Sequence, residues 1–320
     1  MKRNISKYIV FLCTLLTLGS CTEDKFTDSI FQDPSSELDP NSASYPFDAW
    51  LYDNYLVPFN LDFRYRLQDV GADMDYNLVP TQYDKAIDMA LLVKYLWFDA
   101  YSTAIDNEFL KMYGPRIIHL IGSPAFNPAN GTMILGLAEG GIKVSLFRCN
   151  YLDYKDVAML NEFYFKTMHH EFAHIMHQTK TYPKEFNTIS SVYYEPFSWQ
   201  NRDPRVVASL GFVTPYASSQ TREDFVEVIA NYIVKDDTEW NALLQTAAKG
   251  WQINGGSVVE VPDADGVEGD KIILRKLSIC RQWLRDSWNI DLDKLRDEVQ
   301  FRQNNINMED LRKQLDKYKQ

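Results

Sequence analysis

Apolar residues recur at helical spacing over much of the chain. This spacing predicts helices over residues 48–66, 84–113, 155–178 and 221–234, and two or three amphipathic helices within residues 271–319. Residues 116–121 form a short β-branched run, and the apolar runs 132–137 and 142–147 flank Gly140 and Gly141 as the strands of a hairpin do. The pattern therefore predicts a mainly helical α+β fold with a small mixed sheet before the helix at 155–178.

Two stretches lack a clear period. Residues 182–215 are aromatic-rich and irregular, and the glycine-rich, acidic residues 254–270 are typical of a loop. Five aromatic residues of the first stretch are candidates either for the lining of a pocket or for the core: Phe186, Tyr193, Tyr194, Phe197 and Trp199.

The N-terminus has the pattern of an export signal. Residues 1–7 are basic, residues 8–18 are apolar, and Leu18-Gly19-Ser20 precede Cys21. These four residues resemble a bacterial lipobox, in which cleavage leaves an acylated N-terminal cysteine, so Cys21 is the predicted lipidation site; the alternative is an ordinary signal peptide. The acidic residues that follow are similar to the tag of surface-exposed lipoproteins. We therefore expect a lipoprotein signal peptide at 1–20, a flexible tether at 21–44 and one domain at 45–320 that ends in a helical part.

Composition and charge narrow the function classes. The 320 residues are 45% hydrophobic and carry a net charge of −11, which is ordinary for a globular protein and repels nucleic acid. No run of 18 apolar residues is present, so no transmembrane helix is predicted. Of the four cysteines, Cys149 and Cys280 remain in the predicted domain, either as a disulfide or as buried thiols.

Four of the five histidines lie within nine residues, on the helix predicted at 155–178. His170-Glu171-Phe172-Ala173-His174 is an H-E-x-x-H motif, in which two imidazoles one helical turn apart can bind one zinc ion. Glu171 is placed to reach a water at the metal. The alternative is a pair of buried histidines bonded to carbonyl groups.

A catalytic zinc site needs a third protein ligand. His177 lies about 10 Å along a continuous helix from His170, too far to share the ion. No later histidine exists, so we expect a carboxylate. Glu223 and Glu227 lie four residues apart beside the apolar face of the next helix, where one could bind metal and the other orient a histidine; the alternative is a solvated acidic face capped by Thr221 and Asp224.

The motif pair H-E-x-x-H and E-x-x-x-E, about 50 residues apart, resembles that of the gluzincin peptidases. Tyr216, seven residues before Glu223, matches a tyrosine of lethal-factor-type toxins. The lipobox and the phrases HEFAHIMHQ and GFVTPYASSQTREDFVEVIANYI resemble more closely the zinc-binding metallopeptidase lipoproteins, also called substrate-import-associated zinc metallohydrolase lipoproteins. The resemblance is strong over residues 165–234 and loose over the rest of the mature chain.

This resemblance implies a zincin-like metallopeptidase domain and a role for each residue of the site. His170, His174 and Glu223 are the expected zinc ligands, and Glu171 is the base. Glu227 is expected beside the ligands, and Tyr216 near the transition state. Apart from the resemblance, His177 is also expected beside the ligands because it lies on the same helix. The resemblance also implies association with a TonB-dependent outer-membrane importer.

The leading hypothesis is a zinc metallopeptidase held to the outer membrane by lipid on Cys21, with its domain exposed at the cell surface or in the periplasm. Its substrate would be a peptide or protein, which could add as a strand to the hairpin at 132–147. The alternative is a non-catalytic lipoprotein that binds substrate for the importer. A site closed by His177 as fourth ligand would favour that alternative, and a site with an open position would favour hydrolysis.

Overall fold

The computed structural model describes residues 38–67, 77–127, 131, 133–134, 136–139, 143–262 and 268–319. The chain divides into two units, residues 1–42 and 43–320, and the description below concerns the second. The predicted signal peptide, Cys21 and most of the predicted tether lie outside the described residues, as does the Gly140-Gly141 turn.

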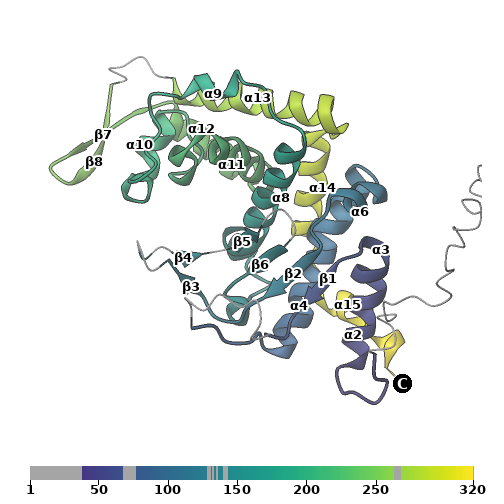
Figure 1. Ribbon diagram of the computed structural model, residues 1–320. Coiled ribbons are helices and arrows are strands. Elements are labelled where there is room, and N and C mark those ends of the chain that lie inside the picture. The colour runs from purple at the N-terminus through teal and green to yellow at the C-terminus, as the bar shows by residue number, and fades with distance from the viewer. Residues whose placement is uncertain are drawn as a thin grey trace, which may run out of the picture. The chain divides into compact units, whose positions relative to one another are not determined.

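The main sheet is small and mixed, as predicted. Its strands run in the order β1 (Asp62–Arg64), β2 (Ile117–Leu120), β6 (Lys143–Leu146) and β5 (Gly136–Glu139). The first three are parallel, and β5 pairs antiparallel with β6 in the register Gly136 to Leu146. β5 therefore forms one edge of the sheet, beside the helix that carries the histidines (Figure 1). A further short pair, β3 (Ala125–Phe126) with β4 (Met133–Ile134), is antiparallel.

The first predicted helix is shorter than its apolar pattern. α2 (Tyr45–Leu51), the π-helical turn η2 (Tyr52–Leu56) and α3 (Val57–Phe59) are followed by β1, so the prediction of helix as far as residue 66 is wrong. Asn60 ends the helix in the left-handed conformation, with φ of 51°. Phe63 is buried between two less buried neighbours, which is the alternation of a strand and not of a helix.

The second predicted helix is formed by three segments and a separate short helix. α4 (Tyr83–Val93), the π turn η3 (Lys94–Phe98) and α5 (Asp99–Ala104) follow one another without a break. α6 (Asn107–Tyr113) then starts anew, because the Asp106 carboxylate accepts a hydrogen bond from the Phe109 backbone as an N-cap.

The histidine-bearing helix and its partner form the centre of the fold. α7 (Val157–Leu160), the π turn η5 (Asn161–Phe165) and α8 (Lys166–Thr179) form one continuous helical stretch. α11 (Thr221–Val234) packs beside α8, and every residue of α11 from 223 to 234 is buried. The stretch between them contains only short helices, as its irregular pattern predicts: α9 (Phe186–Ile189), η6 (Trp199–Asn201), α10 (Pro204–Ser209) and η7 (Tyr216–Ser219).

The prediction of a loop at residues 254–270 is wrong for its first half. β7 (Gly250–Asn254) and β8 (Ser257–Val261) form a hairpin that projects at one side of Figure 1. Gly255 and Gly256 both have positive φ, 56° and 83°, which suits a tight turn between two strands. The prediction treated this glycine turn and the acidic segment after it as one loop, so it missed strand β8 between them.

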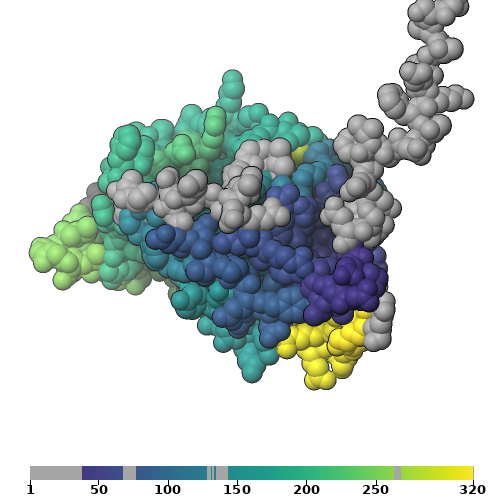
Figure 2. Space-filling model, turned by 60° about the horizontal axis from the view of Figure 1, so that its bottom comes forward, coloured from purple at the N-terminus to yellow at the C-terminus, as the bar shows by residue number. Residues whose placement is uncertain are grey.

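The end of the chain is helical, as predicted for residues 271–319. It comprises α13 (Gly269–Trp288), α14 (Leu292–Asn304), α15 (Met308–Lys313) and η8 (Asp316–Tyr318), and it is preceded by α12 (Asp237–Ala247), which the sequence pattern did not predict. The last turns pack against α2 (Figure 2). Trp50 Nε1 of α2 donates to Gln314 at 3.3 Å, and the Tyr318 hydroxyl donates to Asp53 of η2 at 2.7 Å.

Two further expectations are settled by the described residues. No helix among them is both long enough and apolar enough to cross a bilayer. Cys149 and Cys280 are buried free thiols, so the disulfide alternative is not formed here.

Candidate metal centre

α8 and α11 bring the three predicted zinc ligands together. His170 and His174 lie one turn apart on α8, and Glu223 faces them from α11. Glu223 Oε2 lies 3.1 Å from His170 Nε2 and 3.2 Å from His174 Nε2. Ligands about 2.0–2.1 Å from a tetrahedral zinc ion lie about 3.3 Å from each other. The Glu223 oxygen therefore has the spacing of a shared ligand towards both imidazoles, and the three ligand atoms lie within 4.8 Å of one another.

The protonation pattern of His170 requires a positive charge in this space. Its Nδ1 lies 2.8 Å from Oε1 of Glu227. The pKa of Glu227, which burial raises, is held at about 2 by Lys166, His170 and Thr214, so this carboxylate is ionised and Nδ1 must donate. In a neutral ring, Nε2 would then direct its lone pair at the Glu223 carboxylate. Two acceptors at this distance repel unless a proton or a cation lies between them, and the donor set of two histidines and a glutamate is that of catalytic zinc sites.

The raised pKa of His170 also indicates that the site favours a positive charge. Burial lowers this pKa, but hydrogen bonds with Glu223 and Glu227 outweigh burial and raise it to about 10. The same contacts with His170 and His174 keep the pKa of Glu223 far below its usual range despite burial. The site thus stabilises positive charge between these residues, and zinc would supply it.

The other two predicted partners hold the outer nitrogens of the ligand histidines. Glu227 holds Nδ1 of His170, and His177 Nε2 lies 2.9 Å from Nδ1 of His174. Such bonds fix the orientation of a metal-binding imidazole. His177 is therefore occupied with His174, and the cluster of possible ligand atoms within the described chain contains only His170, His174 and Glu223.

The acidic residues of α11 are buried, which excludes the alternative of a solvated face. Glu223 is 8% exposed, Glu227 1% and Asp224 0%. Gln220 precedes the helix without forming a side-chain cap, so capping by Thr221 and Asp224 is not observed. Asp224 instead accepts hydrogen bonds from Tyr194 and forms an ion pair with Lys276.

Three residues that support the site were not identified from the sequence. Thr214 donates to Glu227 Oε2 at 2.6 Å, Asn231 donates to the same atom at 3.2 Å, and Gln220 donates to Glu223 Oε1 at 3.3 Å. Asn231 lies one turn after Glu227, a spacing that the sequence could have indicated. Thr214 precedes Pro215 at the start of a turn, which is a capping signal but does not point to Glu227.

Glu171, the predicted base, is a partly buried carboxylate with a raised pKa. It lies on α8 directly after His170, a predicted zinc ligand. Burial raises its pKa, while the two ligand histidines act in the opposite direction. A carboxylate with a raised pKa holds a proton more readily at neutral pH, which suits a group that takes a proton and later returns it.

Tyr216 lies at the rim of the metal cluster. Its ring centroid is 5.8 Å from that of His170, and its side chain is partly exposed. Burial of the hydroxyl raises its pKa well above the usual value, and the nearby charge of Glu223 and a hydrogen bond with it act in the same direction. The phenol therefore stays protonated and keeps a hydrogen to donate.

The five aromatic residues proposed for a pocket lining or for the core lie in different environments. Phe186 is in the core, Tyr194 donates to Asp224, and Phe197 is 93% exposed. Trp199 packs edge-on against Tyr216 with a centroid distance of 4.8 Å, so it extends the rim of the metal cluster.

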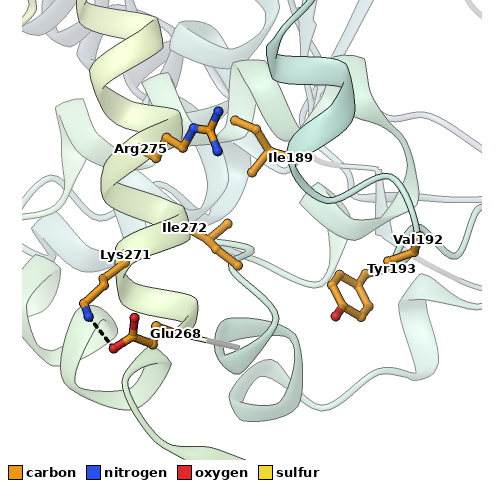
Figure 3. A pocket seen from close by; sticks show the side chains of 7 residues that line it. All are labelled: Ile189, Val192, Tyr193, Glu268, Lys271, Ile272 and Arg275. Atoms are coloured by element: carbon orange, nitrogen blue, oxygen red, sulfur yellow. Dashed lines mark hydrogen bonds and ion pairs between the residues drawn. The ribbon is translucent and has the colours of Figure 1, made fainter. Parts of the chain in front are cut away.

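Tyr193 lines a pocket of about 520 Å³ between the α9 region and α13 (Figure 3). Ile189, Ile272 and Arg275 also line this pocket, and no residue of the metal cluster does. The pocket is therefore separate from the metal centre.

Comparisons with known proteins agree with this geometry. A family described as "Putative zinc-binding metallo-peptidase" matches residues 41–293. A solved structure titled as a putative zinc-binding metallo-peptidase from Bacteroides caccae ATCC 43185 is 40% identical, covers 86% of this chain and 96% of its own, and superposes with a TM-score of 0.68. No curated protein matches the chain. From the extent of these matches, the chain belongs to this family of zinc-binding metallopeptidases.

Proposed function

We propose that the protein is a gluzincin-like zinc peptidase that cleaves peptide bonds in peptides or proteins. The observation that carries the proposal is the set of three protein ligands, His170, His174 and Glu223, with a carboxylate base next to it. Catalytic zinc sites use three protein ligands and keep one position open, whereas structural sites are closed by four. His177, the residue that could close the site, is bonded to His174 instead.

Each residue has a defined task in hydrolysis. Zinc, when bound, polarises the scissile carbonyl and acidifies a water molecule. Glu171 takes the proton of the attacking water on its carboxylate and passes it to the leaving amine. Tyr216 donates its hydroxyl hydrogen to the carbonyl oxygen as negative charge develops there. Glu227 and His177 hold the ligand imidazoles in their orientation.

Strand β5 is suited to hold an extended peptide. It forms an edge of the sheet among the described residues, and it lies against α8, which carries His170 and Glu171. A peptide that pairs with this edge would be fixed by backbone hydrogen bonds, independent of its side chains. Trp199, packed on Tyr216, would contact a substrate side chain next to the scissile bond.

We further propose that the protein is an outer-membrane lipoprotein anchored through Cys21, with its domain at the cell surface, and that it serves a TonB-dependent nutrient importer. Support for this part comes from sequence resemblances alone: the lipobox for the anchor, the acidic residues after Cys21 for the cell surface, and the family resemblance for the importer. A non-catalytic lipoprotein that binds substrate for the importer is the competing function.

The test is zinc stoichiometry combined with the release of new amino termini from a peptide library. We expect one zinc per chain and cleavage by the wild-type protein. Glu171→Gln keeps all three ligands, so it should retain zinc and lose turnover by about 10²–10⁴-fold. Full zinc content without cleavage of any peptide would favour the binding lipoprotein, and equal turnover in Glu171→Gln would remove Glu171 from the mechanism.

A further inference from the structure

The Thr214 hydroxyl joins two parts of the site that are separate in the chain. It accepts a hydrogen bond from the Ala217 backbone N–H at 3.0 Å and donates its single proton to Glu227 Oε2 at 2.6 Å. We propose that Thr214 is a positioning residue that couples the orientation of the zinc ligand His170 to the placement of Tyr216. The Tyr216 half of this inference rests on the proposed function; the zinc half does not.

The first link runs towards zinc. Glu227 uses Oε1 for His170 Nδ1 and Oε2 for Thr214. A carboxylate with both oxygens bonded has a fixed plane, so it can hold the imidazole in one orientation. Without the Thr214 hydroxyl, the carboxylate keeps only the longer bond from Asn231 on Oε2, besides Lys166 at 3.9 Å. The orientation of His170 Nε2 would then be less restricted, and zinc would bind more weakly.

The second link runs towards Tyr216. Ala217 is fully buried, so its N–H needs a partner within the protein, and Thr214 Oγ1 provides it. This bond joins residues 214 and 217 and closes the turn that leads into η7. Pro215 and Tyr216 lie between its two ends. The bond therefore fixes the part of the backbone from which the phenol projects.

Asn231 provides a matched comparison. Its side chain donates to the Glu227 carboxylate and to the Glu227 carbonyl, but within the described part of the chain it makes no hydrogen bond with the turn at 214–217. Removal of the Asn231 amide should therefore affect zinc and leave the turn unchanged. Removal of the Thr214 hydroxyl should affect both.

The test compares Thr214→Val, Thr214→Ala, Thr214→Ser and Asn231→Leu. Zinc affinity is measured by chelator competition, and protection of the Ala217 amide by hydrogen exchange in the zinc-free protein. We expect the Val and Ala variants to lose about 10–100-fold in zinc affinity and up to about tenfold in Ala217 protection, the scale of one hydrogen bond. Thr214→Ser should restore both, and Asn231→Leu should lower zinc affinity only.

Turnover gives a third readout. If Thr214 acts on catalysis through Tyr216, Thr214→Val should lower kcat at saturating zinc with little change in KM. The same substitution should lower kcat much less in a Tyr216→Phe background. Additive losses in the double variant would overturn this part of the coupling.

Three outcomes overturn the proposal as a whole. Unchanged zinc affinity and Ala217 protection in Thr214→Val would do so, as would a Thr214→Ser variant as impaired as Thr214→Val. If both hydroxyl-free variants melt far below the wild type when zinc-free, the role of Thr214 is structural and not positioning. Because zinc affinity and amide exchange need no substrate, they decide about Thr214 even if the protein cleaves no peptide.

Discussion

The ammonium group of Lys276 lies 2.6 Å from the Asp224 carboxylate, and both side chains are fully buried. Lys276 also donates to the Gly211 carbonyl at 2.7 Å, and Tyr194 donates to Asp224 at 2.8 Å. Burial raises the pKa of Asp224 and lowers that of Lys276, and the charge of each partner opposes the change in the other. Since Asp224 follows Glu223, a predicted zinc ligand, this pair holds α11 to α13 directly beside the candidate metal centre.

Removal of the charge on Lys276 should strongly destabilise the protein. Lys276→Met leaves Asp224 buried without its cation, and loss of one partner of a buried pair costs about 3–5 kcal/mol. Chemical denaturation measures the free energy of unfolding. Lys249→Met is the matched control, because its pair with Glu260 is about half exposed and should contribute only about 0–1 kcal/mol. Equal effects of the two substitutions would show that the buried pair is not a main contact of α11.

Zinc content should separate Glu223 from His177. Glu223→Ala removes one of three converging ligand atoms and should abolish stoichiometric zinc binding. His177→Ala removes only the partner of His174 Nδ1, so it should keep zinc at saturating concentration with about 10–100-fold lower affinity. Metal analysis and chelator competition measure both quantities. The reverse order of zinc contents would identify His177 as the third ligand.

Tyr216 should act on turnover and not on binding of zinc. Its hydroxyl is expected to donate to the oxyanion, so Tyr216→Phe should keep zinc and folding and lower kcat by about 10²-fold with little change in KM. Steady-state kinetics on one peptide substrate measures this. If the ring serves only to pack between His170 and Trp199, Tyr216→Phe would be nearly silent and Tyr216→Ala would destabilise the fold.

Cys21 should decide where the protein is found. Cys21→Ala removes the thiol that a lipobox would acylate, so the variant should appear as a soluble or uncleaved precursor instead of in the membrane fraction. Fractionation with metabolic lipid labelling measures this. A labelled, membrane-bound variant would contradict lipidation at Cys21.

Local patterns in the sequence were sufficient for most helices and for half of the metal centre. His170 and His174 lie on one helix at a spacing of four, so their proximity follows from helix geometry alone. Glu227 and His177 were expected beside the ligands, and the structure places them on the outer nitrogens. The β-branched runs predicted the mixed sheet. Two predictions failed locally: the helix ends at Asn60 and strand β1 follows it, and the predicted loop contains strand β8, which the Gly255-Gly256 turn joins to β7.

Only the tertiary structure could decide the contacts between segments that are far apart in the chain. Glu223 was expected against the two histidines about 50 residues earlier only through the family resemblance, because no local pattern reports that contact. No pattern paired Asp224 with Lys276 or joined Thr214 to Glu227. A short-range pattern reports the period of one element, whereas these contacts depend on how α8, α11 and α13 pack. Buried polar groups must find partners wherever packing places them, and that requirement acts between elements, without a fixed spacing in the sequence.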